Sequence, residues 1–164
     1  AINHYYPMSY SDIIFENARE FDLEPELIFA VIHAESRFRA NARSPVGASG
    51  LMQIMEDTAN WIAPMAGIDD FNYSEQIMDP EINIRLGSFY LRMMLNRFED
   101  LTVALSAYNA GSGNVGNWLN NPEYSSDGVT LNYIPFAETR NYIEKVERNM
   151  DIYRTLLNVT SVFR

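Results

Sequence analysis

The chain has 164 residues, 47% of them hydrophobic and 13% aromatic, which is enough for a packed core in a single domain over residues 1–164. Its net charge of −10 argues against nucleic-acid binding and against binding to an anionic membrane, since both favour a basic face. The absence of cysteine excludes disulfides and a cysteine nucleophile, and two histidines, His4 and His33, are too few for a metal-ligand cluster. We therefore expect no metal and no other cofactor.

The apolar periodicity predicts a mainly α protein of six or seven helices with at most one or two short strand pieces. After an extended lead-in over residues 2–7, a first helix capped by Ser9 or Ser11 runs to about Phe21. Pro25 suits the first turn of a second helix, which ends near Phe38. Further helices are expected over residues 56–62, 79–98, 101–110 and 112–119, and from Pro135 onward.

The predicted helix over residues 79–98 contains Gly87, although an interior glycine costs about 1 kcal/mol relative to alanine. We expect another backbone to approach the helix closely at this point. The helix has a stripe at core spacing, made of Ile82, Leu86, Phe89 and Met93. A second stripe lies beside it, made of Asn83, Gly87, Tyr90 and Met94.

Glu35 ends a stripe that is otherwise aliphatic, made of Ile28, Val31 and Ile32. Burial disfavours a carboxylate, so an apolar environment would raise the pKa of this group and let it act as a proton donor near neutral pH. Spacing alone favours another interpretation, because structural ion pairs outnumber catalytic acids. In that case Glu35 pairs with one of three arginines that follow it: Arg37, Arg39 or Arg43.

A glycine-rich loop over residues 44–50 separates the second and third helices. Ser44, Gln53 and Met55 flank this loop, where a ligand can approach the backbone easily. The structural alternative is turn chemistry together with one core methionine.

Polar groups also occur in the second half of the chain. Tyr108 and Asn109 end a short apolar helix before Gly111, where polar side chains are well placed to face a cleft. Their structural alternative is a core tyrosine and an amide near a helix cap. Glu138 and Tyr142 are four residues apart, so they share a helix face, and the alternative is an ordinary surface pair.

Elimination favours carboxylic-acid catalysis, because the sequence shows no metal-ligand set, no cysteine and no histidine within a catalytic motif. Glu35 is the first candidate for the acid. The candidates for a second acid are Glu56, Asp57 and Glu138.

Four ordered motifs point to one family: Glu35-Ser36, Gly47-Ala48-Ser49-Gly50-Leu51-Met52-Gln53-Ile54-Met55, Ala107-Tyr108-Asn109-Ala110-Gly111, and Pro135-Phe136-Ala137-Glu138-Thr139-Arg140-Asn141-Tyr142. Together they closely resemble the catalytic domain of soluble lytic transglycosylases, relatives of goose-type lysozyme. The resemblance extends from about Pro7 to Leu156. One departure is Ala34, where many members of the family carry glutamine.

The resemblance implies a lysozyme-like fold of the α+β superfamily with little strand. It also implies cleavage of the β-1,4 bond between N-acetylmuramic acid and N-acetylglucosamine in peptidoglycan, with a 1,6-anhydro product. The expected partner is therefore the glycan strand of peptidoglycan. The expected location is extracytoplasmic, in the periplasm or cell wall of a bacterium.

The same resemblance assigns roles to individual residues. Glu35 matches the family's single acid and base, which suits a substrate-assisted mechanism without a second carboxylate. The other matches are residues expected to bind the sugar: Ser44, Gln53, Met55, Tyr108, Asn109, Glu138 and Tyr142. Two further hypotheses stay open, a lysozyme-type hydrolase on the same fold and a non-catalytic glycan-binding module.

Overall fold

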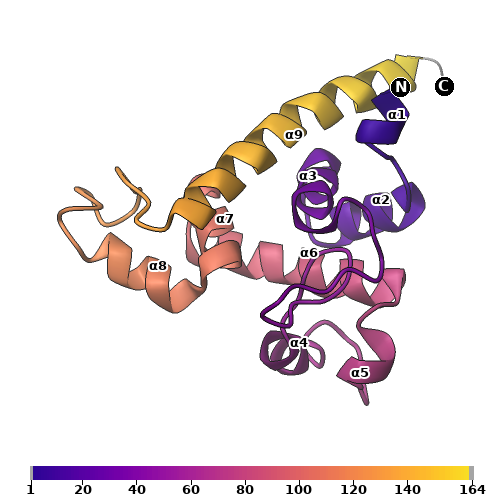
Figure 1. Cartoon of the computed structure of the whole chain (residues 1–164), viewed down its shortest axis with the longest axis horizontal. Coiled ribbons are helices and arrows are strands. Elements are labelled where there is room, and N and C mark those ends of the chain that lie inside the picture. Colours follow the sequence, from indigo (N-terminus) through magenta and orange to yellow (C-terminus); the bar gives the residue numbers. More distant parts are fainter. Residues whose placement is uncertain (1, 163–164) are drawn as a thin grey trace. The chain divides into compact units, whose positions relative to one another are not determined.

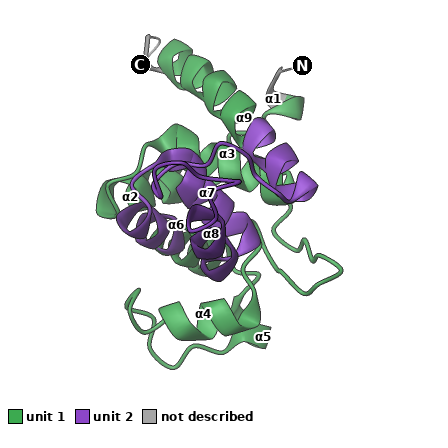
Figure 2. Cartoon of the chain, turned by 90° about the vertical axis from the view of Figure 1, so that its left-hand side faces the viewer, with its two compact units in different colours: residues 1–89, 146–164 green, residues 90–145 purple. Residues whose placement is uncertain are grey.

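The computed structural model describes residues 2–162, and the chain groups into two compact units (Figure 2). Unit 1 comprises residues up to Phe89 and from Val146 onward, and unit 2 comprises Tyr90–Lys145. Two helices, α6 (Pro80–Arg97) and α9 (Ala137–Val162), belong partly to each unit.

The described residues are mainly helical, as predicted (Figure 1). Unit 1 also holds five shorter helices: α1 (Ile2–Tyr5), α2 (Ser11–Glu20), α3 (Pro25–Ser36), α4 (Glu56–Ile62) and α5 (Tyr73–Gln76). Unit 2 contains α7 (Leu101–Ala110) and α8 (Ser112–Leu119). Within residues 2–162, extended pairing is confined to two isolated bridges, Arg43 with Ser49 and Ser49 with Ile54.

The start of the chain differs from the prediction. Residues 2–5 form the short helix α1 rather than an extended lead-in. Neither Ser9 nor Ser11 caps α2, because the residue before the helix is Tyr10, with φ of 61° and no side-chain cap. A serine is only a statistical preference at such a position, and here the chain enters the helix from a left-handed turn.

Helix α3 begins at Pro25 as predicted and ends at Ser36, two residues earlier than expected. Arg37 and Phe38 both have left-handed backbones, with φ of 52° and 63°, so the helix cannot continue through them. This early end places Glu35 in the last turn of α3.

Aliphatic and aromatic side chains of α3 form the centre of unit 1. Ile28, Val31 and Ile32 are fully buried, which confirms the predicted stripe. On the same helix, Phe29 stacks on Tyr153 of α9 with ring centroids 5.1 Å apart. The Tyr153 hydroxyl donates to the Pro7 carbonyl at 2.8 Å, so the chain before α2 is tied to α9.

The buried polar residue Asn83 lies on α6 and holds the segment between α3 and α4. Its Oδ1 accepts from the Met52 N–H at 2.7 Å, and its Nδ2 donates to the carbonyls of Ser49 at 3.0 Å and Ile77 at 2.9 Å. All four residues are fully buried, so the amide provides hydrogen bonds where water cannot. A Cβ at Gly50 would overlap the Asn83 amide, which explains the glycine there.

The glycine at position 87 is required by a neighbouring side chain, that of Met52, and not by a neighbouring backbone as predicted. A Cβ at this position would overlap the Met52 side chain, which packs directly against α6. The stripe predicted at core spacing is not the more buried one, because Asn83, Gly87 and Met94 of the stripe beside it are buried. In the other stripe Leu86 is fully buried, but Ile82, Phe89 and Met93 are partly exposed.

Unit 2 has its own apolar core, formed by the helices α7 and α8 with part of α6. Its buried members include Met94, Val103, Ala107, Val115 and Trp118. The Asp100 carboxylate caps α7 by accepting from the Val103 N–H at 3.0 Å, and Gly111 ends the helix with φ of 93°. The final helix starts at Ala137, two residues after the predicted Pro135.

We expect Asn83→Ala to lower the free energy of unfolding by about 3 kcal/mol or more, because three buried backbone groups lose a hydrogen-bond partner. The measurement is equilibrium urea unfolding. Asn60→Ala, on the exposed side of α4, is the matched control and should change the value by less than about 0.5 kcal/mol. Equal losses in the two variants would show that the Asn83 network contributes nothing to stability.

Candidate active site

Glu35 lies where the apolar centre of unit 1 meets solvent. The side chain is half-buried, whereas the aliphatic residues preceding it on the stripe are fully buried. Its neighbour Ser36 donates its hydroxyl to the Ile32 carbonyl at 3.1 Å, and the Arg37 N–H closes the helix on the His33 carbonyl at 3.0 Å. Glu35 is therefore a partly exposed residue in a helix end that these hydrogen bonds close, and it follows a fully buried aliphatic stripe.

The loop that carries Ser44, Gln53 and Met55 is held by hydrogen bonds from the side chains of Asn83 and Tyr73. Besides the Asn83 hydrogen bonds, the Tyr73 hydroxyl contacts the carbonyls of Gly47 at 3.1 Å and Ile54 at 2.8 Å. Two isolated bridges pair Ser49 with Arg43 and with Ile54. The predicted irregular loop is confirmed, and its geometry is held by residues far away in the sequence.

Hydrogen bonds inside this loop determine which polar groups of Ser44 and Gln53 stay available. The Ser44 Oγ accepts from the Ala48 N–H at 3.0 Å, which leaves the hydroxyl hydrogen as a donor. The Gln53 Nε2 donates to the carbonyls of Ala42 at 3.1 Å and Gly50 at 2.9 Å, which leaves Oε1 as an acceptor. Of these two side chains, therefore, Ser44 can offer a donor and Gln53 an acceptor to a ligand.

Met55 precedes α4 in an extended conformation and is 42% exposed. The alternative of a core methionine is therefore wrong. Glu56 and Asp57, two of the candidates for a second acid, lie exposed in the first turn of α4.

The remaining predicted residues belong to unit 2. Tyr108 is half-buried, with its ring centroid 5.4 Å from that of Tyr90, whose pKa is raised by burial. Asn109 accepts a hydrogen bond from the Thr139 hydroxyl at 2.8 Å, which joins the end of α7 to the first turn of α9. Glu138, the neighbour of Thr139 in the chain, is exposed.

Tyr142 differs from Glu138, although the two residues are four apart on α9. Its side chain is buried, with only 6% exposed, so the alternative of an ordinary surface pair is wrong. The structure thus groups Ser44, Gln53 and Met55 in one loop of unit 1, and it groups Asn109 with the first turn of α9 in unit 2.

A model of the family described as the transglycosylase SLT domain matches residues 12–129, which is more than half of the chain. The chain belongs to this family. This chain is 38% identical over 143 residues to the soluble lytic murein transglycosylase of Salmonella typhimurium, and 37% identical over 143 residues to that of Escherichia coli. Each match covers 86% of this chain and 22% of the relative, so the chain spans about a fifth of the relatives' length.

Solved structures agree with this assignment. The lytic transglycosylase Slt of Pseudomonas aeruginosa, in an inactive variant with glutamine in place of a glutamate, matches with a TM-score of 0.83 and 34% identity. That match covers 96% of this chain and 26% of the other. The 70-kDa soluble lytic transglycosylase of Escherichia coli matches with a TM-score of 0.81 and 32% identity, over 93% of this chain and 25% of that one. The predicted lysozyme-like, mainly α fold is confirmed.

Three residues that position the loop and Asn109 were missed by the sequence analysis as functional: Asn83, Tyr73 and Thr139. For Asn83 the sequence held a usable signal: it is an amide on a helix face whose other residues suit burial, and a buried amide needs hydrogen-bond partners. Tyr73 carried none, since its partners are backbone groups of a distant loop.

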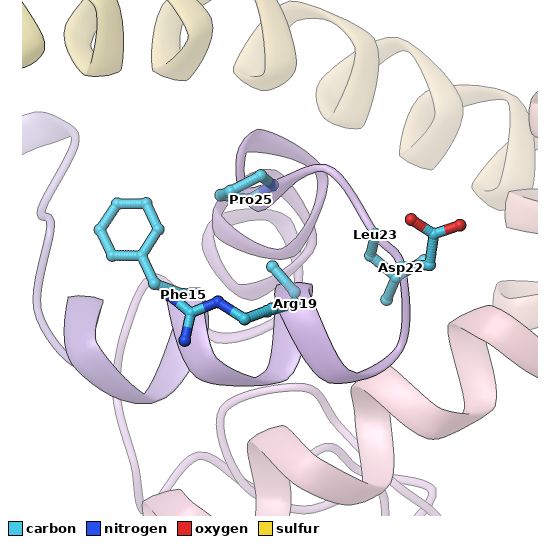
Figure 3. Close-up of a pocket in the computed structure, with 6 residues that line it drawn as sticks. Phe15, Arg19, Asp22, Leu23 and Pro25 are labelled. Carbon is cyan, nitrogen blue, oxygen red and sulfur yellow. The ribbon is translucent and has the colours of Figure 1, made fainter.

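The SLT domain has a pocket of about 600 Å³ that contains no predicted site residue (Figure 3). Its lining comes from α2 and the turn into α3 and combines apolar side chains with one basic and one acidic group: Phe15, Ala18, Arg19, Asp22, Leu23 and Pro25. Among residues 2–162, no group of three or more His, Cys, Asp or Glu side chains is arranged to hold a metal ion. The helices of the same described part are too short or too polar to cross a bilayer.

His33 has a structural role on α3, two residues before Glu35 and about 200° away around the helix. The Asn149 Nδ2 lies 3.2 Å from Nδ1 and can only donate, so Nε2 carries the hydrogen and donates to the Tyr5 carbonyl at 2.7 Å. The ring also stacks on Tyr6, with centroids 4.9 Å apart. Burial lowers the pKa of His33 below its usual value of 6.5, and the nearby positive charges of Arg37 and Arg148 act in the same direction.

We expect the stability of the domain to fall as the pH drops below about 6.5, because the unfolded chain then binds a proton at His33 that the folded chain does not. Above that pH both states are neutral at this residue and the effect disappears. In His33→Gln the loss of melting temperature between about pH 7.5 and pH 5 should be smaller than in the wild type. The control is His4→Gln, at an exposed position; an equal loss in wild type and His33→Gln would contradict the assignment.

Proposed function

We propose that this SLT domain is a peptidoglycan lytic transglycosylase. It cleaves the β-1,4 bond between N-acetylmuramic acid and N-acetylglucosamine and leaves a 1,6-anhydromuramic end, acting as one catalytic domain in the periplasm or cell wall. The proposal rests on the position of Glu35, half-buried at the end of a fully buried aliphatic stripe. It is further supported by the names of the relatives, which are soluble lytic murein transglycosylases.

Glu35 serves as both acid and base in the proposed mechanism. In the first step the protonated carboxyl group gives its proton to the glycosidic oxygen, and the bond from that oxygen to C1 breaks. The 2-acetamido group of the muramic residue stabilises the positive charge that develops at C1. This step requires the neutral acid, and the residues that precede Glu35 on its stripe, Ile28, Val31 and Ile32, are apolar and fully buried.

In the second step Glu35, now a carboxylate, takes the proton from the C6 hydroxyl of the same sugar. The C6 oxygen forms a bond to C1, and the acid is restored, so protons balance over the cycle. The nucleophile is tethered to the sugar that it attacks, which gives it the advantage of an intramolecular reaction. No second protein carboxylate takes part.

The other residues hold the glycan in this proposal. Ser44 donates and Gln53 accepts, following the groups that the loop leaves available, and exposed Met55 contacts an apolar sugar face. Tyr108 orients the acetamido group. Asn109 contacts the sugar directly, and Glu138 and Tyr142 are the remaining residues of the proposed binding site.

The product distinguishes this reaction from hydrolysis. We expect mass analysis of muropeptides released from purified peptidoglycan to show ends lighter by one water than hydrolysed ends, because the C6 hydroxyl replaces water as nucleophile. If all released muramic ends are reducing, the domain is a lysozyme-type hydrolase on the same fold. If nothing is released although the domain binds glycan strands, it is a non-catalytic binding module.

We expect Glu35→Gln to lower the rate of release at least about 100-fold, because a glutamine can neither donate nor recover the proton. The inactive Pseudomonas aeruginosa variant, with glutamine in place of a glutamate, supports this choice of substitution. Glu147→Gln, on the exposed face of α9, is the matched control and should retain wild-type activity. Full activity of a folded Glu35→Gln protein would refute the role of Glu35.

A further inference from the structure

The hydrogen bond between Asn109 and Thr139 determines which end of the Asn109 amide is available. Thr139 is 1% exposed, in the first turn of α9, and its Oγ1 donates to the Asn109 Oδ1 at 2.8 Å. Asn109 itself is half-buried, in the last turn of α7. Both residues belong to unit 2.

An asparagine amide has two ends of nearly equal shape, one that only accepts and one that only donates. Rotation by 180° exchanges them with little steric change, so a neighbouring group must select the orientation. Among the described residues, the Asn109 oxygen is the one acceptor that the Thr139 hydroxyl hydrogen finds. In the rotated amide Nδ2 would donate to the Thr139 Oγ1 instead, but the hydrogen of this buried hydroxyl would lose its acceptor. Leaving a buried donor unpaired is unfavourable, so the observed orientation is preferred.

The Asn109 Nδ2 consequently remains as a donor, without a hydrogen-bond partner among residues 2–162. The amide of Gln53 has the opposite polarity, because both of its N–H groups donate to loop carbonyls. Two amides that look alike in the sequence thus offer different groups to a ligand.

We infer that Thr139 is a positioning residue that makes Asn109 a hydrogen-bond donor to an acceptor oxygen of the glycan, such as an acetamido carbonyl. This inference rests on the proposed function, in which Asn109 contacts the sugar. It predicts that the Thr139 hydroxyl affects glycan binding through the Asn109 amide and not merely through the stability of unit 2.

The test compares Thr139→Val, which keeps the shape and removes the hydroxyl, with Thr139→Ser, which keeps the hydroxyl. Turnover and the dissociation constant are measured with purified uncrosslinked glycan strands. We expect Thr139→Val to raise KM and the dissociation constant about 3- to 10-fold with little change in kcat, because the amide donor loses its fixed orientation. Thr139→Ser should stay within about twofold of the wild type.

A double-mutant cycle separates positioning from a structural role. If Thr139 acts through Asn109, Thr139→Val should have no further effect on binding in an Asn109→Ala background. Asn109→Asp should bind as weakly as Asn109→Ala or more weakly, because a carboxylate still accepts from Thr139 but offers no donor. Urea unfolding of each variant shows whether its binding loss follows a loss of stability.

Three results would overturn the inference: unchanged glycan affinity in Thr139→Val, equal losses in the valine and serine variants, or effects of Thr139→Val and Asn109→Ala that multiply. The proposed function fails by a different observation, namely the absence of anhydro products from the wild type. The dissociation constants still decide the role of Thr139 in that case, because they do not depend on turnover.

Discussion

The Asn83 amide is the interaction on which the loop of the proposed site depends. One side chain on α6 provides three hydrogen bonds to the fully buried backbone of Ser49, Met52 and Ile77. An irregular loop cannot satisfy these groups by itself, and leaving them unpaired in an apolar interior is costly. Gly50 and Gly87 belong to the same arrangement, since a side chain at either position would overlap Asn83 or Met52.

The framework also determines what the polar side chains can offer to a ligand. The Gln53 N–H groups hold the loop together, so its oxygen remains, whereas the Asn109 oxygen is held by Thr139, so its nitrogen remains. In both cases the structural hydrogen bond uses one end of an amide and leaves the other. If these side chains bind the glycan as proposed, the same residue provides both rigidity and recognition, which lowers the entropic cost of orienting a ligand.

Helix α3 carries His33 and Glu35 on different sides, so the two side chains have different surroundings. His33, whose pKa is lowered by burial, lies between the Tyr5 carbonyl and the Asn149 amide and so connects the first residues of the chain to α3 and α9. Glu35 lies about 200° further around the helix, half-buried beyond the aliphatic stripe. The proposed acid thus stands on a helix whose other contacts keep it rigid, as the placement of a catalytic group requires.

The sequence alone determined the helices α2 to α4 and α6 to α9, because apolar periodicity, Pro25 and the glycine stops are local signals. It also determined the candidate Glu35, through contiguous motifs of the SLT family. It did not predict the helix α1 or the left-handed entry to α2. Only the tertiary structure decided that Asn83 pairs with Ser49 and Met52 and that Thr139 pairs with Asn109, each partner being 30 or more residues away in the chain. The second of these contacts leaves the nitrogen of the Asn109 amide, and not its oxygen, as the remaining group. The two ends of an amide are the same residue in a sequence, and only a neighbour in space distinguishes them.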